Sequence, residues 1–231
     1  MKSLREATIH RHRALNPHLW DGLELKPDVR EALLRFGRAW ARYALIPERD
    51  VLDVRFVGGN ASYYYSAGSD VDVHVLVDKK QLGYEAIMDQ FLEDRKDLWT
   101  LKHHVTVKGY SVEPYAQDVD DFVPPDEAVY SLVDDRWVQE PVLTEYDPDK
   151  DAALARKVEQ WKRVLAKASE GTDAEAMRGL KERVKSMRSA GLHAGGEMSQ
   201  KNLIFKELRN LGYLDMLKKH LRRVEDAKLS D

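Results

Sequence analysis

The sequence contains no cysteine and no apolar run long enough to cross a membrane. The first absence excludes disulfide bonds, thiolate zinc sites and redox chemistry at cysteine. The second matters because a membrane-spanning helix needs about 20 consecutive apolar residues. The N-terminus, Met1-Lys-Ser-Leu-Arg-Glu, also lacks the apolar core of a signal peptide. Together these absences predict a soluble protein of the cytoplasm with no membrane partner.

The sequence also lacks a strong net charge, but the charge is uneven along the chain. It has 37 Lys or Arg and 40 Asp or Glu, a formal net charge of −3. Residues 151–231 contain 18 basic and 12 acidic residues, a net charge of +6, which leaves −9 for residues 1–150. An acidic part that binds cations and a basic part that faces phosphates suit an enzyme of nucleotides or nucleic acid. Helices with ordinary Lys- and Arg-rich surfaces give the same asymmetry.

The first part of the chain mixes strand and helix patterns. We expect Leu19 and Trp20 to anchor an N-terminal arm to the core. The elements predicted after this arm are a helix from Pro27 to about Leu45, strands over 51–57 and 71–77 joined by a helical segment with Tyr63, Tyr64 and Tyr65, a helix over 80–101, a hairpin over 104–108 and 110–115, and a hairpin or edge strand within 129–141. The residues expected on the buried side of helix 80–101 are Tyr84, Ile87, Met88, Phe91, Leu92 and Leu98.

From Asp147 onward the pattern changes to long helices. Glycines mark their predicted ends, which gives helices over about 149–169, 172–190, 196–211 and 214–227. A chain of 231 residues can bury a sizeable core as one domain or as two small ones. We therefore predict an α+β fold, with a small mixed sheet and flanking helices in residues 1–147 and a helical lobe in residues 148–231.

Residues 56–78 combine a glycine turn with a valine-rich strand. An apolar run ends at Gly58-Gly59, and ten residues later Asp70 and Asp72 alternate with valines, followed on the same face by His74. Successive side chains of a strand point to opposite faces, so the valines are expected inside and the two carboxylates outside. Two carboxylates on one face suit hard divalent cations. Chance gives roughly seven acidic pairs at this spacing, so the pair alone indicates no more than a solvated strand face.

The combination of these features is more specific than the acidic pair. An apolar strand, Gly58-Gly59, a spacer and an acidic pair between apolar residues resemble the nucleotidyltransferase signature of the DNA polymerase beta superfamily. The resemblance implies transfer of a nucleoside monophosphate from a nucleoside triphosphate to an acceptor hydroxyl, with release of pyrophosphate. It also implies a third carboxylate from a later strand, which Glu113 supplies between Val112 and Pro114. Glu113 is otherwise a plain surface glutamate.

The resemblance assigns roles to individual residues. Asp70, Asp72 and Glu113 are the implied catalytic residues and the ligands of two Mg²⁺ or Mn²⁺ ions. Glycines let the backbone approach a triphosphate closely, and the N–H groups at the start of a helix attract its oxygens. Candidate nucleotide-binding residues are Gly58, Gly59, Asn60, Ser69, Lys201 and Lys206. Gly59 replaces a serine of many relatives, which leaves that phosphate contact to backbone N–H groups, Asn60 or Ser62.

Most of the chain also resembles uncharacterised nucleotidyltransferase-like proteins that are often found in bacteriophage genomes. The matching stretches are Leu15-Asn16-Pro17 with Leu19-Trp20-Asp21, Ser69-Asp70-Val71-Asp72, Gly109-Tyr110 with Val112-Glu113 and Tyr115, and Asn202 with Phe205-Lys206, Leu208-Arg209 and Gly212-Tyr213. The resemblance names no acceptor, and the basic helical lobe favours RNA or a nucleotide. Two alternatives stay open: an inactive binder of nucleotide or nucleic acid, and a toxin-like enzyme that adenylylates proteins.

Overall fold

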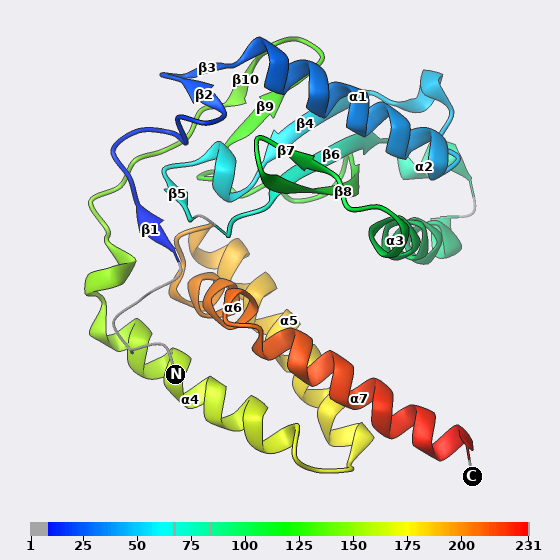
Figure 1. The fold of residues 1–231 in the computed structure, drawn as a ribbon, viewed down its shortest axis with the longest axis vertical. Helices are drawn as coiled ribbons and strands as arrows, with labels where there is room; N and C mark the ends of the chain where they lie inside the picture. The colour runs from blue at the N-terminus through cyan, green and yellow to red at the C-terminus, as the bar shows by residue number, and fades with distance from the viewer. Residues whose placement is uncertain (1–8, 67, 84, 231) are drawn as a thin grey trace. The chain divides into compact units, whose positions relative to one another are not determined.

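The computed structural model describes residues 9–66, 68–83 and 85–230, without the side chains of Glu85 and Ala86. Contacts divide the chain into two compact units. Unit 2 consists of Arg11–Val123 and Glu127–Thr144, and it contains a six-stranded sheet with helices. Unit 1 consists of Met1–His10, Pro124–Asp126 and Glu145–Asp231, and its long elements are helices. The predicted α+β fold class is confirmed (Figure 1).

The sheet of unit 2 is mixed, and its strands lie in the order β10-β9-β4-β6-β8-β7. One pair of neighbours, β6 and β8, is parallel, and the other neighbours are antiparallel. The strands are β4 (Asp53–Val57), β6 (Val71–Val77), β7 (Thr106–Val107), β8 (Tyr110–Asp118), β9 (Val129–Ser131) and β10 (Arg136–Gln139). The turn between β7 and β8 is Lys108-Gly109, both with positive φ, as a two-residue hairpin loop requires.

One face of the sheet is apolar, as the alternating pattern predicts. Val71, Val73, Val75 and Val77 are all buried. Helix α1 (Pro27–Tyr43) packs on this face through Gly37, where a Cβ atom would lie 2.5 Å from Cγ1 of Val54. Because α1 covers this face, the polar side chains of β4, β6 and β8 lie on the opposite face of the sheet.

The single helix predicted over 80–101 is wrong, because α2 (Lys79–Leu82) and α3 (Glu85–Lys102) are separate. Gly83 ends α2 at φ 82° and ψ 160°, a conformation that only glycine adopts readily. The buried side of α3 also differs from the prediction. Met88, Phe91 and Leu92 do pack on the core, but Ile87 is 64% exposed and Leu98 is 42% exposed. Tyr84 lies outside the described residues.

The Tyr-rich segment is not helical, and that prediction is also wrong. A single turn, η2 (Gly59–Ala61), is followed by the short strand β5 (Tyr64–Tyr65). Tyr65 stacks on His12 with ring centroids 3.8 Å apart, and Tyr64 Oη lies 2.6 Å from Thr144 Oγ1. Three consecutive aromatic residues favour an extended backbone over a helix. The described contacts of these tyrosines are packing contacts within unit 2.

The N-terminal arm is anchored as predicted. Leu19 and Trp20 are buried, and the indole of Trp20 stacks on Phe56 at a centroid distance of 5.4 Å and on Trp137 at 4.8 Å. Trp20 begins the short strand β2 (Trp20–Asp21), which pairs with β3 (Glu24–Leu25). Closer to the N-terminus, β1 (His10–Arg11) pairs with β5. These contacts bring the arm next to the glycine turn.

Helix α1 ends with a leucine in a conformation that suits glycine. Leu45 has φ 62°, its N–H bonds to Arg42 O, and the N–H of Ile46 bonds to Ala41 O, which is a Schellman motif. The left-handed conformation costs an L-residue roughly 1–2 kcal/mol. The Leu45 side chain is 70% exposed, so its removal leaves no cavity. We therefore expect Leu45→Gly to raise the free energy of unfolding by about 1 kcal/mol, measured by urea denaturation. A decrease would show that Leu45 makes a stabilising contact.

Unit 1 contains four helices among its described residues: α4 (Ala152–Ala168), α5 (Ala174–Gly195), α6 (Gln200–Asn210) and α7 (Tyr213–Ser230). A single turn, η3 (Pro148–Lys150), precedes α4. The predicted end of a helix at Gly191 is wrong. Gly191 is buried inside α5, and a Cβ atom there would lie 2.8 Å from Ser199 Oγ and 2.8 Å from Lys201 Cβ. This glycine serves close packing on α6 and does not terminate the helix. None of the described helices of either unit is both long and apolar enough to cross a membrane.

Candidate active site

Asp72 and Glu113 lie side by side in the middle of the sheet of unit 2. They are register partners on the parallel strands β6 and β8. Neighbouring strands are about 4.8 Å apart, and partners in register point to the same face. Both side chains are partly buried, on the face opposite the valines. The fold therefore brings together two carboxylates that are far apart in the sequence.

Asp70 stands one residue before β6, where the strand pairing has not yet begun. Within the described ranges, no group of three or more His, Cys, Asp or Glu side chains is placed to hold a metal ion. The pair Asp72 and Glu113 nevertheless fits Mg²⁺, which proteins usually bind through one or two carboxylates while waters and substrate phosphates complete the shell. A nucleotide would thus supply the remaining oxygen ligands.

The glycine turn packs directly on one of these carboxylates. Gly58 has φ 82° and ψ −162°, and a Cβ atom on it would lie 2.0 Å from Asp72 Oδ2. The next glycine, Gly59, lies beside Ser69, because its Cβ atom would be 3.4 Å from Ser69 Oγ. The turn and the acidic strand, which the sequence separates by a spacer, are therefore in contact. A triphosphate that approached the backbone of this turn would also reach Asp72.

Asn60 holds the glycine turn in place through hydrogen bonds. It is fully buried, and its Nδ2 atom donates to Ser69 O at 2.8 Å and to Asp70 O at 3.0 Å. Its Oδ1 atom accepts from Asn16 Nδ2, and its backbone oxygen accepts from the Trp20 indole, both at 2.8 Å. Both amide N–H groups of the side chain are occupied. These bonds favour a structural role for Asn60 over the predicted phosphate contact.

This structural role gives a prediction. We expect Asn60→Ala to lower the free energy of unfolding by about 3 kcal/mol, because it removes hydrogen bonds from one buried partner, Asn16, and two partly buried ones, Ser69 O and Asp70 O. Chemical denaturation measures this loss. Ser62→Ala is the matched control, since Ser62 Oγ in the same turn bonds only Gly59 O and Tyr64 N. If Asn60→Ala left the stability unchanged but weakened nucleotide binding, the structural role would be wrong and Asn60 would be a phosphate ligand.

A row of polar side chains adjoins the two carboxylates. Arg55, His74 and Tyr115 are register partners across β4, β6 and β8, and Ser131 of β9 is the partner of Arg55. Burial lowers the pKa of His74 to about 4, although its hydrogen bond with Gln117 opposes the shift. The imidazole is therefore neutral at neutral pH. It adds no charge next to Asp72.

Arg55 is held in this row by an acidic neighbour. Its Nε atom lies 3.1 Å from Asp53 Oδ2, and Ser131 Oγ donates to Asp53 Oδ1 at 2.8 Å. Arg55 and Ser131 were not predicted as site residues, and Tyr115 was named only as part of the resemblance. The alternation of Asp53 and Arg55 along β4 was a signal for a polar face, but the pairing of β4 with the strand at 129–131 was not predicted.

The predicted lysines lie in unit 1. Lys206 of α6 forms an ion pair with Glu197. Burial raises the pKa of Glu197, but the charges of Lys206 and Arg188 and the hydrogen bonds from Lys206 and Asn202 outweigh burial and hold that pKa below its usual range. Lys206 thus neutralises a buried carboxylate within its own unit. Lys201 is exposed near the start of α6 and has the more accessible ammonium group.

Comparisons with known proteins add little to this geometry. No family model and no curated protein matches the chain. A solved structure, the STING-associated CdnE c-di-GMP synthase from Capnocytophaga granulosa, matches 90% of this chain and 84% of that chain. Its sequence identity is 12% and its TM-score is 0.23. At this level the similarity supports no functional conclusion, so the site is interpreted from its own residues.

Proposed function

We propose that this protein is a nucleotidyltransferase that moves a nucleoside monophosphate from a nucleoside triphosphate to an acceptor hydroxyl. The observation that carries the proposal is the contact of three elements in unit 2. Asp72 and Glu113 are in register on parallel strands, and Gly58 packs against the Asp72 carboxylate. A site that joins two carboxylates to an open glycine backbone suits a substrate that brings both a cation and phosphates.

Each residue has a defined task in the proposed reaction. Asp72 and Glu113 would hold Mg²⁺ or Mn²⁺, and Asp70 would complete a two-ion site with them. When bound, the ions would supply the positive charge that lowers the pKa of the attacking hydroxyl and offsets charge on the leaving group. Gly58 and Gly59 let the triphosphate lie against the backbone. The acceptor oxygen bonds to the α-phosphorus, the bond from that phosphorus to the bridging oxygen breaks, and pyrophosphate leaves.

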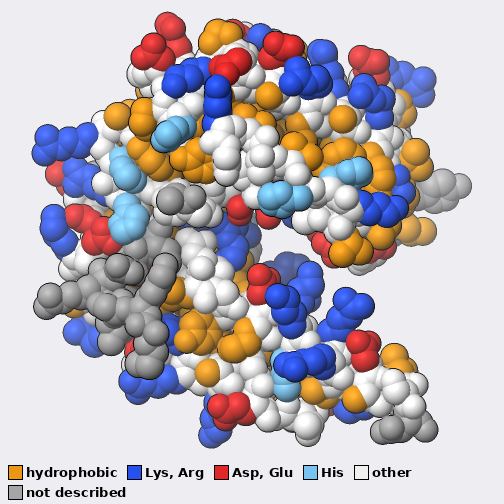
Figure 2. Space-filling view, in the orientation of Figure 1, with side chains coloured by type: hydrophobic (Ala, Val, Ile, Leu, Met, Phe, Trp, Pro, Cys, Tyr) orange, Lys and Arg blue, Asp and Glu red, His pale blue; other side chains and the backbone are white. Residues whose placement is uncertain are grey.

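Glu113 is also the proposed acceptor of the hydroxyl proton. We assign catalysis to residues 1–147 and acceptor binding to the helical lobe in residues 148–231. The net charge of +6 in residues 151–231 favours RNA or a nucleotide as the acceptor. On the face that Figure 2 shows, Lys and Arg side chains are spread over the helices of unit 1.

The test is a labelling experiment. The protein is incubated with each labelled nucleoside triphosphate and Mg²⁺ or Mn²⁺, in separate reactions with total RNA, free nucleotides and a protein extract. We expect metal-dependent label in the RNA or nucleotide reaction, and none with Asp72→Asn. Label in the protein extract would keep the reaction but change the acceptor. No label above the Asp72→Asn background in any reaction would refute the enzyme and leave a binding protein.

A further inference from the structure

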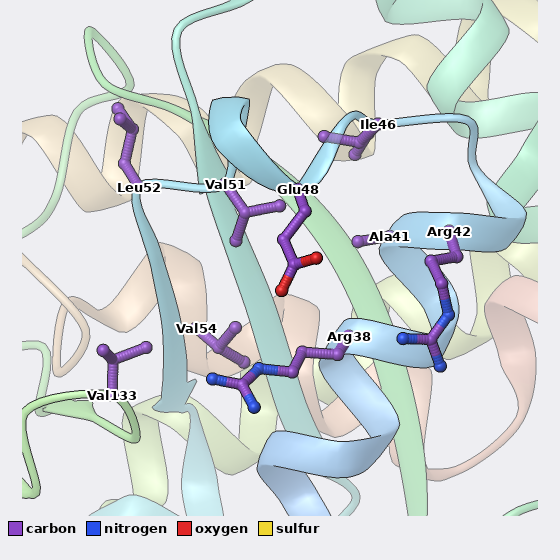
Figure 3. Close-up of a pocket in the computed structure, with 9 residues that line it drawn as sticks. All are labelled: Arg38, Ala41, Arg42, Ile46, Glu48, Val51, Leu52, Val54 and Val133. Carbon is purple, nitrogen blue, oxygen red and sulfur yellow. The ribbon is translucent and has the colours of Figure 1, made fainter.

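Unit 2 contains a cavity of about 190 Å³ on the other face of its sheet from Asp72 and Glu113 (Figure 3). It lies between the C-terminal half of α1 and the segment that enters β4. Ala41, Ile46, Val51 and Val54 give it apolar walls. Val54 belongs to the valine face, as its partner Val75 does. The cavity is therefore separate from the candidate active site.

Three charged side chains also line this cavity: Arg38 and Arg42 of α1, and Glu48 of η1 (Glu48–Asp50). Among the described residues none of the three takes part in an ion pair, whereas Arg35 on the same helix is paired with Glu31. In Figure 3 the Glu48 carboxylate and the Arg38 side chain reach toward the same space from opposite sides. Charges of both signs thus border an apolar cavity.

The size of the cavity limits its occupant. Sites for drug-sized ligands span about 300–1,000 Å³, so a nucleotide is too large for this one. An occupant of this cavity is a single small molecule with one apolar group. Two guanidinium groups require that it carry an anion, and a planar carboxylate matches their geometry.

We propose that this cavity binds one free apolar α-amino acid, of the size of leucine or phenylalanine. The α-carboxylate pairs with Arg38 and Arg42, and the α-ammonium group pairs with Glu48. The side chain lies on Val51, Val54 and Ile46, where it leaves water. Each part of the ligand then meets a group of matching chemistry, and no charge in the cavity is left without a partner.

The experiment is a titration of the full chain with L-leucine and L-phenylalanine, followed by calorimetry and by amide NMR shifts. We expect one binding site, with shifts concentrated at residues 38–54. Leucinamide lacks the carboxylate and is expected to bind at least about tenfold more weakly, since charged hydrogen bonds are lost. L-Glutamate is expected not to bind, because its second carboxylate would enter the apolar part.

Variants separate the two ends of the ligand. Arg38→Gln with Arg42→Gln is expected to weaken leucine binding at least about tenfold, whereas Arg35→Gln on the same helix leaves it unchanged. Glu48→Gln is expected to weaken binding of leucine but not of N-acetyl-leucine, which has no ammonium group. All four residues are exposed, so the variants fold.

Three results would overturn the proposal. The first is no binding of either amino acid up to about 10 mM, a concentration that detects even very weak sites. The second is equal binding of leucine by the protein and by its Arg38→Gln, Arg42→Gln variant. The third is binding of N-acetyl-leucine in clear preference to leucine, which would assign the cavity to the C-terminus of a peptide. None of these results depends on nucleotidyl transfer.

Discussion

Gly58→Ala is expected to lower the free energy of unfolding by about 3 kcal/mol and to displace the Asp72 carboxylate. Two effects add. The conformation at φ 82° and ψ −162° costs a residue with a side chain roughly 1–3 kcal/mol. The new methyl group would also lie 2.0 Å from Asp72 Oδ2, and relief of such overpacking costs about another 1–3 kcal/mol. Chemical denaturation measures the loss of stability, and titration with Mn²⁺ measures the effect on the site.

A second glycine provides the control for this prediction. Gly83 has φ 82° and ψ 160°, nearly the same backbone conformation, but nothing lies within 4 Å of its Cβ position. Gly83→Ala is therefore expected to show the conformational cost alone and to leave metal binding unchanged. Equal losses of stability in Gly58→Ala and Gly83→Ala would mean that the Asp72 carboxylate moves away from the new methyl group at no cost. The contact between Gly58 and Asp72 would then not position this carboxylate. Gly59→Ala meets no positive φ, and its Cβ atom would make only ordinary contacts, the nearest at 3.4 Å, so we expect only a small loss.

The strand faces could be predicted from the sequence because their cause is local. Val71, Val73 and Val75 alternate with polar residues, and alternation determines the face of a strand wherever one face is buried. The register of β6 against β8 is a different matter. It depends on the crossover through α3 between the two strands, and on long-range pairing that no short pattern records. The sequence proposed Glu113 as a partner of Asp72, but only the fold places the two in register.

Glycines show the same limit. Gly83 and Gly191 both interrupt apolar helical patterns, yet the first ends a helix and the second lies inside one. Gly83 adopts a positive φ, whereas Gly191 has a helical backbone and lies where the start of α6 leaves no room for a Cβ atom. A sequence shows where a glycine stands. It does not show whether the backbone conformation or the close approach of a neighbouring residue requires glycine there. For Gly58 both reasons apply at once.

Asn60 illustrates how a local motif can hide distant partners. Its position after two glycines suggested a phosphate contact. Its side chain instead bonds Asn16, Ser69 and Asp70, and its backbone oxygen bonds Trp20. Asn16 was noticed in the sequence only as part of the resemblance, and Trp20 was predicted only to anchor the N-terminal arm to the core. The structure shows that they support the turn beside the candidate active site.

Replacing Asp72 by asparagine is expected to abolish nucleotidyl transfer while the fold survives. The change keeps the size of the side chain but removes one of two adjacent negative charges that suit a cation. Loss of several kcal/mol of charge stabilisation corresponds to a fall of about a thousandfold or more in rate. In metal-free buffer the stability is expected to stay the same or to rise, because like charges on adjacent strands repel.

Further variants show whether Asp72 acts in a site or as a surface acid. Glu113→Gln is expected to cause a similar loss of transfer, and the double variant little more, since both residues serve one unit. Asp70→Asn tests whether the residue before β6 acts together with Asp72 and Glu113. Asp97→Asn, on the exposed side of α3, is the control and is expected to have no effect on transfer. The readouts are labelling by nucleoside triphosphate, Mn²⁺ affinity and melting temperature in chelator. Unchanged labelling and unchanged Mn²⁺ affinity in Asp72→Asn would mean that Asp72 and Glu113 do not bind a cation together. The proposed reaction would then be wrong.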